Sequence, residues 1–261
     1  MEYAIVIPVA FGAALLTFFS GFGLGTILMP VFALFFPVEI AVAVTAIVHL
    51  ANNLFKGVLI WKHIDIRVVT WFAVPAAAAA FAGALLLNRL SGEADLFTYY
   101  LGKREMHITT LKLVIAVLLV VFAILEIDRR LERIRLKRGL LPVGGLLSGF
   151  FGGLSGHQGA LRSLFLLRAG LGKEGFIATG IAVAIVIDIS RLSVYGATFF
   201  SRHFHALMDH STGLVIIAVI SAFAGSFLGR RMLKKVTYRV VSVTVAILIL
   251  ALAFMLGTGI I

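Results

Sequence analysis

Apolar runs of about twenty residues recur along the whole sequence, and this feature limits the possible folds more than any other. A helix rises about 1.5 Å per residue, so a run of that length crosses a hydrocarbon layer roughly 30 Å thick. Because lipid offers the backbone no hydrogen-bond partners, only helices and closed barrels span a bilayer. The runs lack the polar–apolar alternation of barrel strands. The sequence therefore predicts an all-α polytopic membrane protein.

The composition supports this class and excludes others. Hydrophobic residues make up 61% of the chain and charged residues 13%, against about 25% charged residues in soluble domains. The net charge of +11 lies mostly between the apolar runs, as in cytoplasmic loops, so we expect no nucleic-acid partner. Cysteine is absent, which excludes disulfides and thiolate metal sites, and we expect no metal or other cofactor. The first residues include Glu2 and no basic segment, so we expect no cleaved signal peptide.

Two of the apolar segments are too short to cross a bilayer alone. Joined at the glycines between them, 141–151 and 157–168 fit either a re-entrant hairpin or a sharply broken pair of helices. The first half repeats this layout, with a longer first arm and a break at 20–25. The full set of predicted membrane segments is 3–20, 24–36, 39–61, 67–88, 108–126, 141–151, 157–168, 175–200, 211–229 and 237–257.

The letters of the sequence also repeat. The motif "SGF" occurs at 20–22 and 148–150, and "AFAG" occurs at 80–83 and 222–225. Three polar positions inside apolar segments recur at one offset of 135 residues: Glu39, Asn53 and Lys56 correspond to Glu174, Asp188 and Arg191. The sequence therefore predicts a first repeat over 1–126, a basic linker over 127–140 and a second repeat over 141–261.

The distribution of lysine and arginine predicts the orientation. With the linker 127–140 in the cytoplasm, fifteen basic residues fall on that side and four on the other. Both termini then lie outside, in the periplasm of a cell inner membrane, and the two halves enter the membrane from opposite sides. Each half is expected to hold a glycine-broken hairpin followed by three transmembrane helices. Such inverted repeats are typical of secondary transporters with a site near the bilayer midplane.

Away from the ends of the predicted spans lie four charged residues, Lys56, Arg162, Asp188 and Arg191, whereas Lys112 is near the outer end of its span and can extend to the interface. A basic group at the centre of a lone helix costs about 2.5–3.5 kcal/mol, so these groups should face a polar cavity or each other. Asp188 and Arg191 are three residues apart and can form a structural ion pair. Lys56, which follows Asn52 and Asn53, is interpreted as a ligand-binding group, with the cytoplasmic membrane edge as the alternative position for its amine.

The glycines of "SGFFGGLSGHQG" suggest unwound backbone inside the membrane. Such backbone persists only where it is buried in protein or lines a wet cavity, and a helix that restarts there directs free N–H groups at anions. We expect two restarts, near 24–26 and near 156–159, and a small anionic substrate. Glycine as a helix-packing surface is the alternative. His49, on an otherwise apolar helix, is interpreted as a packed core histidine.

A second function class comes from "GLSG" at 153–156, which matches the nucleophile motif of rhomboid intramembrane proteases. Such an enzyme needs a histidine on a later helix within reach of Ser155. The later histidines, at 203, 205 and 210, fall in or beside a loop on the far side of the membrane, so the sequence favours a protein that is not an enzyme. An anion channel stays open as an alternative.

A pattern of glycines, proline, asparagine and lysine runs through both halves. The first half has Gly21, Gly23, Gly25, Pro37, Asn53 and Lys56, and the second has Gly152, Gly153, Gly156 and Gly159. Over nearly its whole length, the chain resembles the TauE/SafE sulfite exporter family, also called the toluene-sulfonate uptake permease family. The resemblance implies an inner-membrane transporter of sulfite, sulfonates or related sulfur oxyanions that is driven by the proton gradient.

These observations predict a secondary transporter, acting as an exporter of small sulfur-containing anions by alternating access. Asp188 or His157 is expected to carry a coupling proton. The expected partners are the anion, the lipid bilayer and, as a candidate, a second copy of the chain. The predicted substrate-binding residues are Gly23, Gly25, Thr26, Asn52, Asn53, Lys56, Gly153, Ser155, Gly156, His157, Gln158, Arg162 and Arg191.

Overall fold

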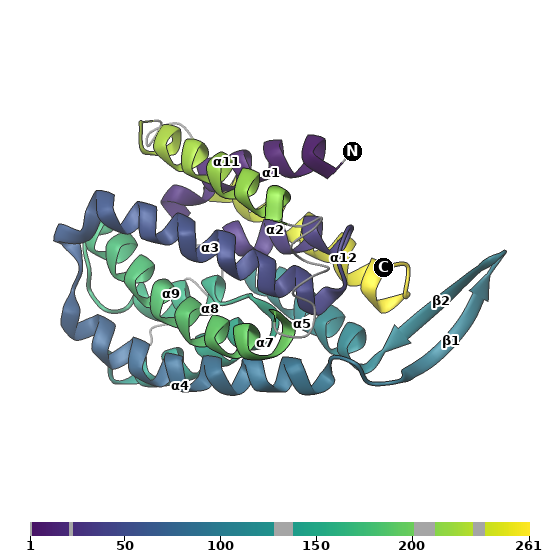
Figure 1. Ribbon diagram of the computed structural model, residues 1–261. Coiled ribbons are helices and arrows are strands. Elements are labelled where there is room, and N and C mark those ends of the chain that lie inside the picture. Colours follow the sequence, from purple (N-terminus) through teal and green to yellow (C-terminus); the bar gives the residue numbers. More distant parts are fainter. Residues whose placement is uncertain (1, 21–22, 128–137, 201–211, 232–237) are drawn as a thin grey trace.

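The computed structural model describes residues 2–20, 23–127, 138–200, 212–231 and 238–261, and most of them form a bundle of helices (Figure 1). Of the predicted linker 127–140, residues 128–137 lie outside the described part. The elements are α1 (Glu2–Ser20), α2 (Leu24–Ala33), α3 (Val38–Ile60), η1 (Trp61–His63), α4 (Ile66–Leu90), β1 (Asp95–Leu101), β2 (Arg104–Thr109), α5 (Thr110–Ile127), η2 (Arg138–Leu140), α7 (Leu141–Ser155), α8 (Gly159–Leu166), α9 (Lys173–Tyr195), η3 (Gly196–Phe200), α11 (Thr212–Arg231) and α12 (Tyr238–Gly257).

Four helical segments are long and apolar enough to cross a membrane: Val38–His63, Ile66–Leu90, Lys173–Thr198 and Thr212–Arg231. The sequence also predicts spans at α5 and α12, which are apolar helices of 18 and 20 residues. The protein is thus a helical membrane protein.

Asp65 caps the N-terminus of α4, because its side chain accepts a hydrogen bond from the Val68 N–H at 3.0 Å.

Both predicted helix breaks are present. Gly23, with φ 110°, precedes α2, and Gly156, with φ 81°, ends α7. Only glycine adopts this left-handed backbone without strain. The arms that follow are short, since α2 has 10 residues and α8 has 8, and at about 1.5 Å per residue neither crosses a bilayer. Every residue of α2 is buried, so this arm lies inside the bundle.

The second break lies later than the sequence predicts. The predicted arm ended at residue 151, but α7 continues through Gly152 and Gly153 to Ser155. The "SGF" letters at 148–150 therefore lie inside α7, whereas the other copy at 20–22 begins at the last residue of α1. The two "SGF" sequences therefore do not lie at equivalent positions of the two halves. The left-handed glycines, Gly23 and Gly156, mark the two breaks instead.

The helix α7 lies against α4 through glycines on one face. A Cβ added at Gly145, Gly149 or Gly153 would collide with a carbonyl oxygen of α4, at Phe72, Ala76 and Ala80 in turn. The spacing of four residues keeps these glycines on one side, which lets the two backbones touch. Gly225 of α11 meets the Phe11 carbonyl of α1 in the same way. The packing alternative for the glycines is therefore correct for this stretch of α7, while Gly156 forms the break.

A β-hairpin follows α4 and corrects the expectation of an all-α chain. Strands β1 and β2 pair antiparallel, and the turn between Leu101 and Arg104 contains Gly102 with φ 65°. The hairpin extends away from the helices near the C-terminus (Figure 1). Its side chains reach the end of the chain, where the Tyr99 hydroxyl donates to the Thr258 carbonyl at 2.7 Å. The aromatic and β-branched residues on both sides of a two-residue turn are a hairpin signal, whereas the apolar runs alone predict only helices.

Candidate functional site

The site is built on α3 and α9, which pack against each other. Each helix has 23 residues, and both bounds of α9 follow those of α3 by 135 residues. The predicted polar pairs, Asn53 with Asp188 and Lys56 with Arg191, therefore occupy equivalent positions of the two helices. All four side chains are buried.

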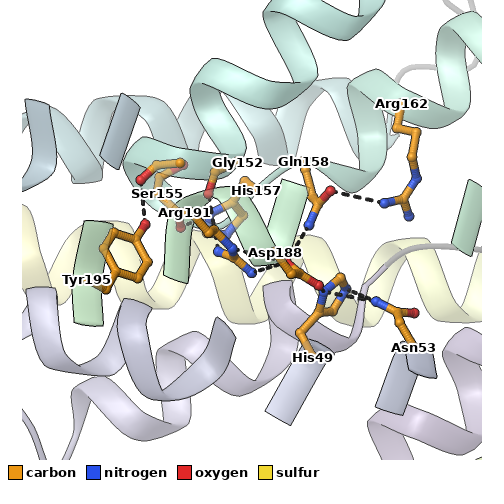
Figure 2. A network of polar contacts seen from close by, with 11 residues as sticks. His49, Asn53, Gly152, Ser155, His157, Gln158, Arg162, Asp188, Arg191 and Tyr195 are labelled. Carbon is orange, nitrogen blue, oxygen red and sulfur yellow. Dashed lines mark hydrogen bonds and ion pairs between the residues drawn. The ribbon is translucent and has the colours of Figure 1, made fainter. Parts of the chain in front are cut away.

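Asp188 is the centre of a buried polar network (Figure 2). Its Oδ1 accepts hydrogen bonds from Arg191 Nε at 3.0 Å and Nη2 at 2.7 Å, and from Gln158 Nε2 at 2.9 Å. Its Oδ2 lies 2.6 Å from His49 Nδ1 on α3. The predicted ion pair between Asp188 and Arg191 is confirmed, and the same carboxylate also connects the two halves of the chain.

The second helix break is held to this network by side chains. Arg191 Nη1 donates to the Gly152 carbonyl at 3.1 Å, near the end of α7. Gln158, in the break itself, accepts a hydrogen bond from Arg162 Nη1 at 3.2 Å through its side-chain oxygen. The Gln158 carbonyl accepts from Ser148 Oγ at 2.9 Å. The unwound backbone therefore has partners, as a polar segment inside a membrane needs.

The two breaks meet. A Cβ added at Gly25, in the first turn of α2, would lie 3.6 Å from the Gly156 carbonyl oxygen and 3.6 Å from His49 Cδ2. It would also lie 3.7 Å from Thr45 Cγ2. The start of the second arm in one half thus contacts the interruption in the other. The neighbouring Gly23 and Thr26 are buried beside it.

Lys56 and Asn52 form a second polar group on α3. Lys56 is buried, with 4% of its surface exposed, and its interpretation as a ligand-binding group stays a prediction. In the amide orientation that satisfies its neighbours, Asn52 accepts from Lys56 Nζ at 3.2 Å and lies 2.7 Å from Ser226 Oγ on α11. Lys56 and Arg162 are close enough to repel each other electrostatically. Asn53 lies one turn away, with its amide nitrogen 3.0 Å from His49 Nδ1.

The chain also matches a known protein family. The family model described as "Sulfite exporter TauE/SafE" matches residues 6–256. The chain belongs to the TauE/SafE sulfite exporter family. This is a family of membrane transporters, so the expectation drawn from the resemblance is confirmed at the level of the family. No curated protein and no solved structure matches the chain.

In this TauE/SafE chain, the residues of the protease motif make structural contacts. Ser155 Oγ donates to the Phe151 carbonyl at 3.0 Å, one turn earlier in α7. The adjacent His157 contacts the Ser155 carbonyl instead of the hydroxyl, with Nδ1 at 2.8 Å. Gly153 faces α4, and its carbonyl accepts a hydrogen bond from the Tyr195 hydroxyl. The histidines at 203, 205 and 210 lie outside the described residues. In the part of the chain that is described, no three His, Asp or Glu side chains gather as metal ligands would.

His49 belongs to the site, although its immediate sequence context alone does not indicate this. His49 was interpreted as a packed core histidine, and it is buried and hydrogen-bonded, but its partner is the central carboxylate Asp188. The signal was present in the spacing, because Thr45, His49, Asn53 and Lys56 repeat every three or four residues and so share one helix face. Ser226 gave no comparable signal, since it is one small polar residue in an apolar helix.

Proposed function

We propose that this chain is a secondary transporter, acting as an exporter, of small sulfur-containing anions such as sulfite or organosulfonates. One observation carries the proposal: the two helix breaks meet at Gly25 and Gly156 beside three buried basic side chains. These are Lys56, Arg162 and Arg191, none more than 4% exposed. Of the acidic residues whose side chains the structure describes, Asp188 is the buried one.

The chemistry of the breaks suits an oxyanion. The first N–H groups of α2 and α8 have no partners within their own helices, and the positive ends of the helix dipoles are at Leu24 and Gly159. Such termini bind the oxygens of anions. The amides of Asn52, Asn53 and Gln158 add hydrogen-bond donors, while the three basic residues supply charge. A sulfite or sulfonate group, with several oxygens around one sulfur, can accept hydrogen bonds from helix N–H groups and basic side chains together.

The position of the site fits a transport path. One cavity, of about 540 Å³, lies at the end of α4 and the start of α3 and includes Arg104 and Lys112. Another, of about 390 Å³, lies at the start of α4 and includes Arg67 and Arg138. The polar residues 45–56 of α3 lie between these two ends. Both cavities also contain acidic side chains, Glu39 and Glu93 in the first and Asp65 in the second. The support for a path is therefore their position, since a buried site between two cavities suits alternating access.

We further propose that the halves are inverted repeats. The equal lengths of α3 and α9 support this, and so does an exchange in packing, because α4 lies along α7 while α11 lies along α1. In this proposal the linker 127–140 is cytoplasmic, both termini are periplasmic, and the protein is in the cell inner membrane. We also propose that Asp188 or His157 carries a coupling proton, and a second copy of the chain is a candidate partner.

The experiment is uptake of labelled sulfite into proteoliposomes with and without an imposed pH gradient. We expect saturable uptake that responds to the gradient. Lys56→Gln and Arg162→Gln should each reduce uptake by roughly 30-fold or more, since losing a buried charge contact costs about 2 kcal/mol or more. Arg230→Gln, which changes an exposed arginine at the end of α11, is the matched control and should leave uptake unchanged.

Two results would overturn this proposal. Anion current without saturation and without an effect of pH would indicate a channel. Unchanged uptake in both Lys56→Gln and Arg162→Gln, with folded protein in the liposomes, would place the anion elsewhere.

A further inference from the structure

His157 has a defined tautomer, which sets what the ring can do. Its Nδ1 lies 2.8 Å from the Ser155 carbonyl oxygen. A carbonyl oxygen only accepts hydrogen bonds, so Nδ1 carries the hydrogen and donates. In the neutral ring, Nε2 then has a lone pair and accepts. The backbone of the helix break thus determines which ring atom is left for another partner.

That second atom has no partner within the described residues. His157 is 2% exposed, and its Nε2 makes no hydrogen bond there. A buried acceptor without a donor costs about 1–3 kcal/mol, and most such groups in proteins are satisfied. The ring is also held in place, because it stacks on Phe122 of α5 with centroids 5.5 Å apart and planes 17° from parallel. An acceptor that is both costly and fixed suggests a ligand contact.

The surroundings place this acceptor at the proposed anion site. His157 directly follows Gly156, whose carbonyl contacts Gly25 of the other break. The charged groups on this side are Arg191 and its ion partner Asp188, both on α9, and Arg191 acts electrostatically on the ring (Figure 2). The contact from α5 is the apolar Phe122 ring. A ligand at this point meets the Arg191–Asp188 ion pair and one acceptor nitrogen.

A second buried polar atom borders the same contact. Thr45 Oγ1 on α3 also has no hydrogen-bond partner within the described residues, and its methyl group packs against Gly25. A threonine hydroxyl both donates and accepts, so it can bind the anionic oxygens of a ligand. His157 Nε2 cannot donate to an anionic oxygen while the ring is neutral, since this nitrogen carries no hydrogen. Thr45 Oγ1 can therefore bind an anionic oxygen of a ligand, while His157 Nε2 can bind a hydrogen-bond donor of the same ligand.

We infer that His157 Nε2 accepts a hydrogen bond from the transported anion, so that the site prefers anions that also carry an O–H or N–H donor. This inference rests on the proposed function and narrows its substrate class. Hydrogensulfite and hydroxyalkanesulfonates belong to the preferred class, whereas sulfate and unsubstituted alkanesulfonates do not. A site that holds a hydrogen-bonding group for a ligand rejects analogues lacking that group, because its own buried atom stays unpaired.

The test compares two ligands that differ by one hydroxyl, ethanesulfonate and isethionate, by calorimetric titration of the purified full chain in detergent. We expect isethionate to bind at least about fivefold more tightly, the lower limit for satisfying one buried acceptor. His157→Phe keeps a ring to stack on Phe122 but removes the lone pair, and it should bind the two ligands equally. Thr45→Val, the matched control, should weaken both and keep the preference.

The outcomes separate this inference from the proposed function. Equal binding of the two sulfonates by the unchanged protein overturns the inference while leaving the anion site in place, and this comparison holds even if His157→Phe does not fold. A preference for isethionate that persists in folded His157→Phe also overturns it. Failure of the unchanged protein to bind either sulfonate or sulfite contradicts the proposed function itself.

Discussion

Helices α3 and α9 have the same length and the same register, yet their polar residues do different things. In α9, Arg191 has a carboxylate three residues earlier, and Asp188 and Arg191 form an ion pair with both side chains 0% exposed. In α3, the residues three and four positions before Lys56 are the amides Asn53 and Asn52. One helix carries a charge with its counter-charge, and the other carries a charge beside hydrogen-bonding groups.

This difference assigns separate tasks to equivalent positions. The Asp188–Arg191 pair is hydrogen-bonded to the Gln158 side chain and the Gly152 carbonyl, so it fixes the shape of the break. In α3, Lys56 contacts Asn52, and the Asn52 amide also contacts Ala222 and Ser226 of α11. We expect changes in α9 to reduce the stability of the protein first, and changes in α3 to affect the bound anion first.

The largest effect is expected at the carboxylate. Asp188→Asn leaves Arg191 buried without its counter-charge, and breaking a buried ion pair by removing one partner costs about 3–5 kcal/mol. The equivalent change in α3, Asn53→Ala, should cost only about 1 kcal/mol, the value of one ordinary hydrogen bond. Thermal unfolding in detergent measures both. Equal losses in the two variants would show that the helices share the structural task.

An intermediate effect is expected where the backbones touch. Gly149→Ala places a methyl group against the Ala76 carbonyl of α4, and overpacking of this kind costs about 1–3 kcal/mol. Gly12→Ala, in the equivalent first arm α1, meets nothing within 4 Å, so the better helix propensity of alanine should make it neutral or slightly stabilising. The melting temperatures of the two variants compare the first arms directly. A stable Gly149→Ala protein would mean that α4 and α7 separate easily.

The smallest effect is expected at α11. Ser226→Ala removes the contact with the Asn52 amide, 2.7 Å in length, and should cost about 1 kcal/mol of stability. Because the same amide accepts from Lys56, we also expect a weaker affinity for sulfite, seen as a higher half-saturation concentration with an unchanged maximal rate. An altered maximal rate with normal affinity would instead connect Ser226 to the conformational change.

Local features of the sequence predicted the breaks, the i,i+3 ion pair and the shared register of α3 and α9. Glycines and charged residues in an apolar helix affect the structure within a few residues, so local patterns are sufficient to predict these features. The contact of His49 with Asp188 spans 139 residues, and no local pattern specifies which distant carboxylate a buried histidine meets. The extent of α7 was also missed, because glycine weakens a helix in water but permits close backbone contact in the membrane.

The glycine face of α7 has a mechanical consequence for the whole molecule. Because α4 comes from the first half of the chain and α7 from the second, their backbone contact fastens the halves across the boundary between them, and α1 with α11 does so again. Each of these closely packed helix pairs therefore combines helices from both sequence halves. In the proposed transporter, we expect each moving part to contain helices from both halves, so that cutting the chain at the linker would not yield two independently working units.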